Sequence, residues 1–118
     1  MKLIRSFRYA WAGIRACFNS EPNFRIHLFA AIAAILFSLL FRVSAAEWLA
    51  VCFCIVLVIT MEMMNTAIEK LCDVVHQELH PGIKNVKDIA AGAVLLSAFF
   101  SLLTAAVIFL PKIIMYLK

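Results

Sequence analysis

Long apolar stretches bounded by charged residues dominate the pattern of the chain. Sixteen residues without a formal charge lie between Arg25 and Arg42, and twenty-three lie between Asp88 and Lys112. A helix rises about 1.5 Å per residue, and the apolar core of a bilayer is about 30 Å thick. The longer stretch is therefore sufficient to cross a membrane, and the shorter one reaches that length when it includes residues at its ends.

Another apolar stretch is interrupted by one acid. Only fourteen residues separate Glu47 from Glu62, but the apolar pattern continues through Glu62 to Ile68, which gives twenty-one residues with one internal carboxyl group. We interpret this stretch as membrane-spanning as well. The pattern thus predicts an all-α membrane protein with three transmembrane helices, near 26–43, 46–71 and 88–112.

The N-terminal segment has a different periodicity. At 100° per residue its large apolar side chains fall on one face of a helix and its basic side chains fall on the opposite face. The apolar face has Leu3, Ile4, Phe7, Trp11, Ile14 and Phe18, and the basic face has Lys2, Arg5, Arg8 and Arg15. We expect an amphipathic surface helix within 1–22, lying in the headgroup plane. The alternative, a helix that packs on a soluble core, has little soluble core available.

The composition excludes an ordinary soluble domain. The 118 residues suit a single domain, 1–118, but 65% of them are hydrophobic and only 15% are charged, whereas soluble domains have about 25% charged residues. The four cysteines are spaced neither as a metal site nor as a disulfide framework, and we interpret them as buried small hydrophobic residues. They are Cys17, Cys52, Cys54 and Cys72.

Basic residues are distributed unevenly between the two ends of the predicted helices. Eight lysines and arginines lie in the N-terminal segment and in 70–87, against three in the first connection and at the C-terminus. Because cytoplasmic loops are enriched in Lys and Arg, the N-terminus and the second connection are predicted to be cytoplasmic. The net charge of +4 then reflects orientation and attraction to anionic lipids rather than nucleic-acid binding.

Polar residues recur along the second predicted transmembrane helix. Their spacings of three, four, four and three place five of them within about 80° on a helical wheel. They are Glu62, Asn65, Glu69, Asp73 and His76. An ionisable residue costs about 2.5–3.5 kcal/mol at the centre of a transmembrane helix, so a row of them indicates a specific role.

Two interpretations of this polar stripe are open. The first is a hydrogen-bonded seam between helices, in which the acids pair with Lys70, Lys84 or Lys87. The second is a cation site in a water-accessible cleft, because stacked carboxylates can hold Mg²⁺, an ion that also binds phosphates.

Further acids and bases lie at the same predicted membrane surface. Glu21 follows the surface helix, and Glu78 and Asp88 flank a polar connection at 77–87 with a Pro-Gly turn signal. The basic residues of this connection are His80, Lys84 and Lys87. Acids for a metal and lysines for phosphate together indicate phosphoryl transfer. The chain has no GxxxxGK[ST] or GxGxxG motif, so an ATP site has to be of another kind.

Four sequence blocks carry a resemblance to a known family. Residues 62–69 read EMMNTAIE and residues 87–94 read KDIAAGAV, with GIR at 13–15 and EPNFRIH at 21–27. In combination they resemble the prokaryotic diacylglycerol kinase family, which includes small integral-membrane diacylglycerol kinases and undecaprenol kinases. The likeness extends over essentially the whole chain.

The resemblance implies an assembly and a reaction. The assembly is a homotrimer of three-span subunits, each with an N-terminal surface helix, whose active sites are shared between neighbouring subunits. The reaction uses Mg²⁺ and ATP to phosphorylate diacylglycerol or undecaprenol. The location is the bacterial cytoplasmic (inner) membrane, with the N-terminus and the active site on the cytoplasmic side.

The resemblance also implies roles for individual residues. Glu62 corresponds to the general base, Glu21 and Glu69 correspond to the Mg²⁺-binding glutamates, and Asn65 corresponds to the asparagine on the same stripe. The residues that match nucleotide contacts are Tyr9, Glu78, His80, Lys87 and Asp88, the last two at phosphate and ribose.

One departure from the family pattern leaves the lipid open. Diacylglycerol-specific members carry an acid where this chain has His27, and the form NFRIH resembles members that often prefer undecaprenol. Two other functions also suit the stripe. A small proton- or cation-coupled transporter would use Glu62 but does not explain the lysine-bearing connection. A structural subunit that binds a partner predicts no dependence on Mg²⁺.

Overall fold

Four helices make up the chain in the computed structural model, which describes residues 1–76, 78 and 80–118. They are α1 (Lys2–Ser20), α2 (Pro22–Leu40), α3 (Ala45–Val75) and α4 (Pro81–Leu117). The prediction of an all-α protein is confirmed, since the described residues include no β-strand.

The helices α2, α3 and α4 are each long and apolar enough to cross a membrane. Large apolar side chains point outward from them: Phe29 is 76% exposed, Leu95 is 70% exposed and Val107 is 75% exposed. Apolar surface of this extent is unfavourable in water, whereas lipid tails are as apolar as these side chains. The protein is therefore a multi-pass membrane protein, as the apolar stretches predicted.

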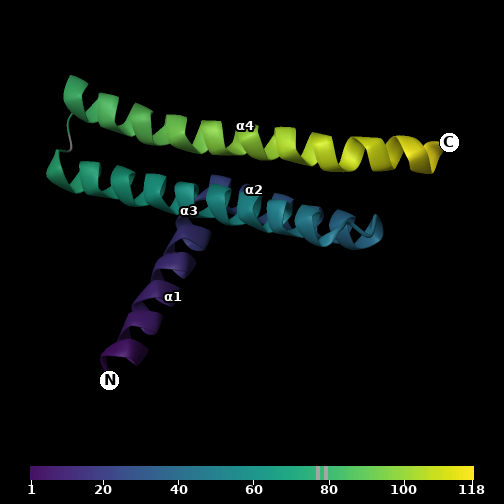
Figure 1. Cartoon of the computed structure of the whole chain (residues 1–118). Helices are drawn as coiled ribbons and strands as arrows, with labels where there is room; N and C mark the ends of the chain where they lie inside the picture. The colour runs from purple at the N-terminus through teal and green to yellow at the C-terminus, as the bar shows by residue number, and fades with distance from the viewer. Residues whose placement is uncertain (77, 79) are drawn as a thin grey trace.

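The central helix is α3, which contacts each of the other three helices. In Figure 1, α4 runs back along α3, α2 lies beside the N-terminal half of α3, and α1 leaves the bundle at a steep angle. Because α2 is shorter than α3, the corner between α1 and α2 lies beside the middle of α3 rather than at its end. Residues at this corner are thus brought close to the polar stripe.

The corner between α1 and α2 is held by Arg25. Glu21 has an extended backbone (φ −120°) between the two helices, and Pro22 begins α2. Arg25 Nη1 donates hydrogen bonds to the carbonyl oxygens of Phe18 at 2.5 Å and Asn19 at 3.4 Å. These carbonyl groups lie in the last turn of α1 and accept no hydrogen bond within their own helix. A cation at this position also interacts favourably with the helix dipole. The corner thereby fixes the position of Glu21.

The helix α1 keeps most of its apolar side chains exposed. Cys17 is its one buried residue, whereas Phe7 is 69% exposed and Trp11 is 59% exposed. A headgroup layer would cover this apolar face, which agrees with the predicted surface helix. Its position in the membrane stays a prediction.

The opposite connection, between α2 and α3, ends in a capping box. Ser44 Oγ accepts a hydrogen bond from the backbone N–H of Glu47 at 3.2 Å, and Glu47 Oε1 accepts one from the backbone N–H of Ser44 at 2.9 Å. Glu47 Oε2 also lies 3.1 Å from Lys112 Nζ of α4. One side chain thus defines the first turn of α3 and ties it to α4.

The connection between α3 and α4 is shorter than the sequence predicted. We expected a loop over 77–87, but the chain is helical from Pro81 onward. Proline is favoured at the first position of a helix, and His80 Nδ1 accepts a hydrogen bond from the backbone N–H of Gly82 at 3.0 Å. The Pro-Gly pair therefore begins a helix rather than forming a turn.

The bounds of α2 and the C-terminal end of α4 also differ from the prediction. α2 begins at Pro22, four residues early, because proline again takes the first helical position, and it ends at Leu40. α4 continues through Pro111 to Leu117. Of the predicted loop, positions 77 and 79 lie outside the described residues.

The cysteine prediction is correct for three residues and wrong for one. All four thiols are free, and Cys17, Cys54 and Cys72 are buried, but Cys52 is exposed. On a helix, residues two apart point about 200° from each other. The burial of Cys54 against neighbouring helices therefore directs Cys52 outward, where lipid is an adequate environment for a small hydrophobic side chain.

The capping box predicts a measurable contribution to stability. Replacing an N-cap serine with alanine costs about 1 kcal/mol, so Ser44→Ala should lower the free energy of unfolding by about that amount. The matched control is Ser6→Ala, because the Ser6 hydroxyl only donates to the Lys2 carbonyl within α1. Unfolding in mixed detergent micelles measures both. A Ser44→Ala variant as stable as Ser6→Ala would show that the box does not stabilise α3.

Candidate active site

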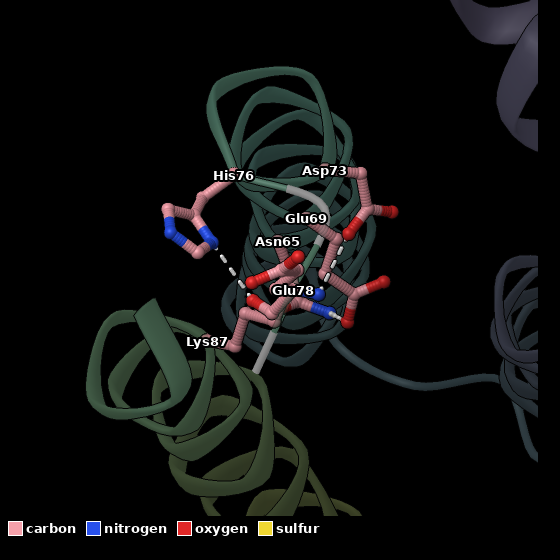
Figure 2. A network of polar contacts seen from close by, with 6 residues as sticks. All are labelled: Asn65, Glu69, Asp73, His76, Glu78 and Lys87. Atoms are coloured by element: carbon pink, nitrogen blue, oxygen red, sulfur yellow. Dashed lines mark hydrogen bonds and ion pairs between the residues drawn. The ribbon is translucent and has the colours of Figure 1, made fainter. Parts of the chain in front are cut away.

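Burial decreases along the polar stripe of α3. Glu62 is 3% exposed and Asn65 is 9% exposed, whereas Glu69 is half-buried and Asp73 is exposed. Figure 2 shows the outer part of the stripe, where the carboxyl groups of Glu69 and Asp73 point to the same side of α3. The stripe therefore connects a buried helix interface with the exposed end of the helix.

His76 does not belong to this stripe. The helix ends at Val75, and His76 has an extended backbone with φ −151°. Its ring Nδ1 lies 2.9 Å from the carbonyl oxygen of Glu78 (Figure 2). The spacing argument is wrong for this residue because it assumed that the helix continues one residue further.

Glu62 lies where α3 meets α2, near the corner between α1 and α2. Its Oε2 is 3.7 Å from His27 Nε2. The carboxyl groups of Glu21 and Glu69 are close enough to interact with it electrostatically. The three carboxyl groups repel one another electrostatically, and a cation nearby would offset this repulsion.

Asn65 joins the buried and the exposed parts of the stripe. Its Nδ2 donates a hydrogen bond to Glu69 Oε1 at 3.1 Å (Figure 2), and this bond fixes the orientation of the amide. Asn65 Oδ1 and Thr66 Oγ1 are buried and have no hydrogen-bond partner in the part of the chain that the structure describes. Since buried polar atoms normally have partners, both oxygens are open positions for a ligand or a water.

Lys87 reaches the stripe from α4. Its Nζ lies 2.7 Å from Asp73 Oδ1 (Figure 2), whereas Lys84 Nζ pairs with Asp88 Oδ2 at 2.7 Å within α4. The seam interpretation is thus correct for Asp73. It does not extend to Glu69, for which the described residues provide no ion pair, although Lys87 is close enough to interact with it electrostatically.

The other predicted nucleotide residues lie at the periphery. Glu78 is exposed in the short connection between α3 and α4, and the ring of His80 caps the first turn of α4. Tyr9 is 69% exposed on α1, which leads away from α3 (Figure 1). A single chain therefore does not bring Tyr9 to the polar stripe.

The oxygen atoms of the site are chemically suited to Mg²⁺. This ion prefers oxygen ligands and is usually held by one or two carboxylates together with substrate phosphates and water. Glu21 and Glu69 offer carboxylates, and Asn65 offers a buried carbonyl oxygen without a partner. Within residues 1–76, 78 and 80–118, no three acid, His or Cys side chains are close enough to hold an ion alone. The oxygen donors present fit an ion of this kind.

Comparison with known proteins identifies the family. The family model described as prokaryotic diacylglycerol kinase matches residues 8–109, which include every candidate residue named above. The chain belongs to the prokaryotic diacylglycerol kinase family.

Three relatives illustrate the range of this family. A diacylglycerol kinase of Synechocystis is 39% identical over 113 residues, which are 95% of this chain but 65% of that longer protein. An undecaprenol kinase of Bacillus subtilis is 37% identical over 112 residues, which are 95% of this chain and 91% of the relative. A diacylglycerol kinase of Escherichia coli is 28% identical over 103 residues, covering 87% and 84% of the two chains.

The diacylglycerol kinase family match also bears on the competing interpretations. The relatives are named as kinases that act on two different lipids. A transporter is not supported. The similarity to a diacylglycerol kinase and to an undecaprenol kinase is nearly equal, so identity alone does not select the lipid.

Sequence reasoning missed the contact between His27 and Glu62. It singled out His27 only as a departure from the family pattern. A signal was available, because each residue is the ionisable group deepest in its own apolar stretch, and such groups pair with one another in membranes. Thr66 was also missed as a buried open oxygen, and its small polar side chain gave no comparable signal.

The buried hydroxyl of Thr66 leads to a stability prediction. An unpaired buried hydroxyl costs about 1 kcal/mol or more, so Thr66→Val, which keeps the shape, should raise the free energy of unfolding by about 1 kcal/mol. Thr60→Val is the matched control, because Thr60 Oγ1 already donates to the Val56 carbonyl at 2.7 Å. A destabilised Thr66→Val variant would instead indicate that the hydroxyl binds a partner, such as a buried water.

Proposed function

We propose that this protein is a lipid kinase that transfers the γ-phosphate of ATP, with Mg²⁺, to the hydroxyl group of a membrane lipid alcohol. Membership of the diacylglycerol kinase family supports the reaction class. The observation that carries the proposal is the carboxyl group of Glu62, which is 3% exposed in a membrane-spanning helix and within electrostatic range of two further acids. The product is phosphatidic acid from diacylglycerol or undecaprenyl phosphate from undecaprenol.

Glu62 acts as the general base in this proposal. Its carboxylate accepts the proton of the lipid hydroxyl while the hydroxyl oxygen bonds to the γ-phosphorus, and the bond from that phosphorus to the bridging oxygen of ADP breaks. Glu62 lies fourteen residues, or about 21 Å, along α3 from Trp48 near the opposite membrane surface. That depth matches a hydroxyl group held just below the headgroup layer.

Glu21 and Glu69 would hold the metal ion. Glu69 lies seven residues beyond Glu62, about 10 Å along the helix axis, and Asn65 orients its carboxyl group through a hydrogen bond of 3.1 Å. Bound Mg²⁺ supplies neutralisation of the phosphate charge. The protein contribution is mainly the alignment of phosphate and hydroxyl group on one helix face.

Residues of α4 and the preceding connection bind the nucleotide. The ion pair with Asp73 already directs Lys87 to the stripe, where its charge can stabilise the transferring phosphoryl group. Asp88, the residue that follows Lys87 in α4, is exposed, pairs with Lys84 and is suited to hydrogen-bond ribose hydroxyls. The remaining proposed contacts are Glu78, His80 and Tyr9.

A homotrimer with shared sites explains two features of the single chain. Tyr9 is exposed on a helix that leads away from the stripe, and the carboxyl groups near Glu62 do not form a metal site alone in the described chain. A neighbouring subunit would supply the missing contacts. The excess of Lys and Arg at the N-terminus and in the second connection supports a cytoplasmic site, on the side where ATP is present.

The proposed reaction is tested with purified protein in mixed micelles. Radiolabelled ATP and Mg²⁺ are supplied with diacylglycerol or with undecaprenol in separate reactions, and labelled lipid is measured. We expect Mg²⁺-dependent transfer to at least one lipid, and the ratio of kcat/KM values identifies the preferred one. Absence of transfer to either lipid would refute the proposed function.

Glu62 and Glu69 form a matched pair of variants, because both are glutamates on one face of α3. Glu62→Gln should lower kcat by about 10²-fold or more, since it removes the base, and should leave the KM for ATP unchanged. Glu69→Gln should raise the KM for Mg-ATP by about tenfold or more, since it removes a metal ligand. Near wild-type turnover of Glu62→Gln, or an unchanged KM in Glu69→Gln, contradicts the corresponding role.

A further inference from the structure

The contact between His27 and Glu62 joins two transmembrane helices at the buried end of the polar stripe. His27 Nε2 of α2 lies 3.7 Å from Glu62 Oε2 of α3, and the two side chains are 22% and 4% exposed. This separation is longer than a hydrogen bond. Catalytic hydrogen bonds are often long before the substrates bind and shorten in the reactive complex.

His27 differs in charge from the other titratable groups around Glu62. Those that interact with it electrostatically are His27 on α2, Glu69 on α3 and Glu21 at the corner before α2. The two glutamates repel a carboxylate at this position, whereas an imidazole N–H attracts it. Ionised carboxylates have no proton to donate. Among these three neighbours, His27 alone can therefore donate a hydrogen bond to the Glu62 carboxylate.

His27 also lines a mostly apolar pocket. The pocket has a volume of about 250 Å³ between α2, α3 and α4, and its walls include Ala31, Val58 and Leu102. Its two hydroxyl side chains, Ser101 and Thr104, donate to backbone carbonyls of α4. These side chains provide no hydrogen bond to a carboxyl group. His27 thus borders this pocket and also approaches the buried acid through its Nε2.

We propose that His27 is the positioning residue that holds the Glu62 carboxylate in the orientation from which it accepts the proton of the lipid hydroxyl. The inference rests on the proposed function, because it assigns a role relative to the base of that reaction. His27 acts through Glu62 and contacts neither the metal nor the nucleotide. It therefore affects turnover and leaves nucleotide binding unchanged.

The geometry distinguishes two amide substitutions at this position. The amide nitrogen of glutamine can occupy the place of His Nε2, whereas the amide nitrogen of asparagine can occupy the place of Nδ1. Since Nε2 faces Glu62, His27→Gln should preserve the contact and His27→Asn should lose it. Both variants are uncharged and polar, so a general effect of polarity on the helix interface is the same in each.

The experiment measures kcat and the KM for ATP with the better lipid substrate in mixed micelles. We expect His27→Gln to stay within about threefold of the wild-type kcat and His27→Asn to lose about 10- to 100-fold, with the KM for ATP unchanged in both. Ser38→Ala is the control for packing, because Ser38 is fully buried on the same helix and only donates to the Ala34 carbonyl. Equal activities of the two amide variants would overturn the proposal, as would a raised KM with unchanged kcat.

A second measurement separates positioning from a structural role. In the background of Glu62→Gln, whose residual activity no longer uses the base, His27→Asn should cause no further loss of kcat. An additional loss as large as in the wild-type background would show that His27 acts independently of Glu62. If the wild-type protein phosphorylates neither lipid, the proposed function itself is refuted. If the wild type is active but the His27 variants keep the wild-type kcat, only the role of His27 is refuted.

Discussion

A carboxyl group that is removed from water needs a favourable polar neighbour at short range, and the nearest such neighbour of Glu62 is His27, on another helix. An ionised carboxylate without one costs several kcal/mol in a low-dielectric region. His27 on α2 meets this requirement only if α2 packs at one particular height along α3. Arg25 then determines how the chain enters α2, because it caps the end of α1 beside Glu21. The position of α1 thus follows from the same packing.

The helical pattern of the fold could be predicted because a bilayer imposes a simple rule on each span. Apolar stretches bounded by charges, such as that between Arg25 and Arg42, have few alternatives to a transmembrane helix. The helix ends were predicted less well. Pro22 and Pro81 each begin a helix, yet a proline beside polar residues equally suits a loop, and only the packing of the following turn distinguishes the two outcomes.

The same distinction between local and packing information applies to the site. The common face of Glu62, Asn65 and Glu69 follows from the helical repeat alone, so spacing was sufficient to predict it. The partner of Asp73 was not predictable in this way, because three lysines were within reach and only the contact between α3 and α4 selects Lys87. The approach of His27 to Glu62 likewise depends on the height at which two helices cross, which no local rule supplies.

The uninterrupted length of α3 has a consequence for the lipid bilayer. Its 31 residues form one helix of about 46 Å, so Glu62 lies about 27 Å from the capping box at Ser44. The protein fixes this distance, whereas the bilayer fixes the depth of a lipid hydroxyl group. A thicker or thinner membrane therefore moves the hydroxyl along α3 unless the helix tilts in compensation. Acyl-chain length of the surrounding lipids then influences how the lipid hydroxyl group aligns with the proposed base, independently of any change in the proposed binding residues.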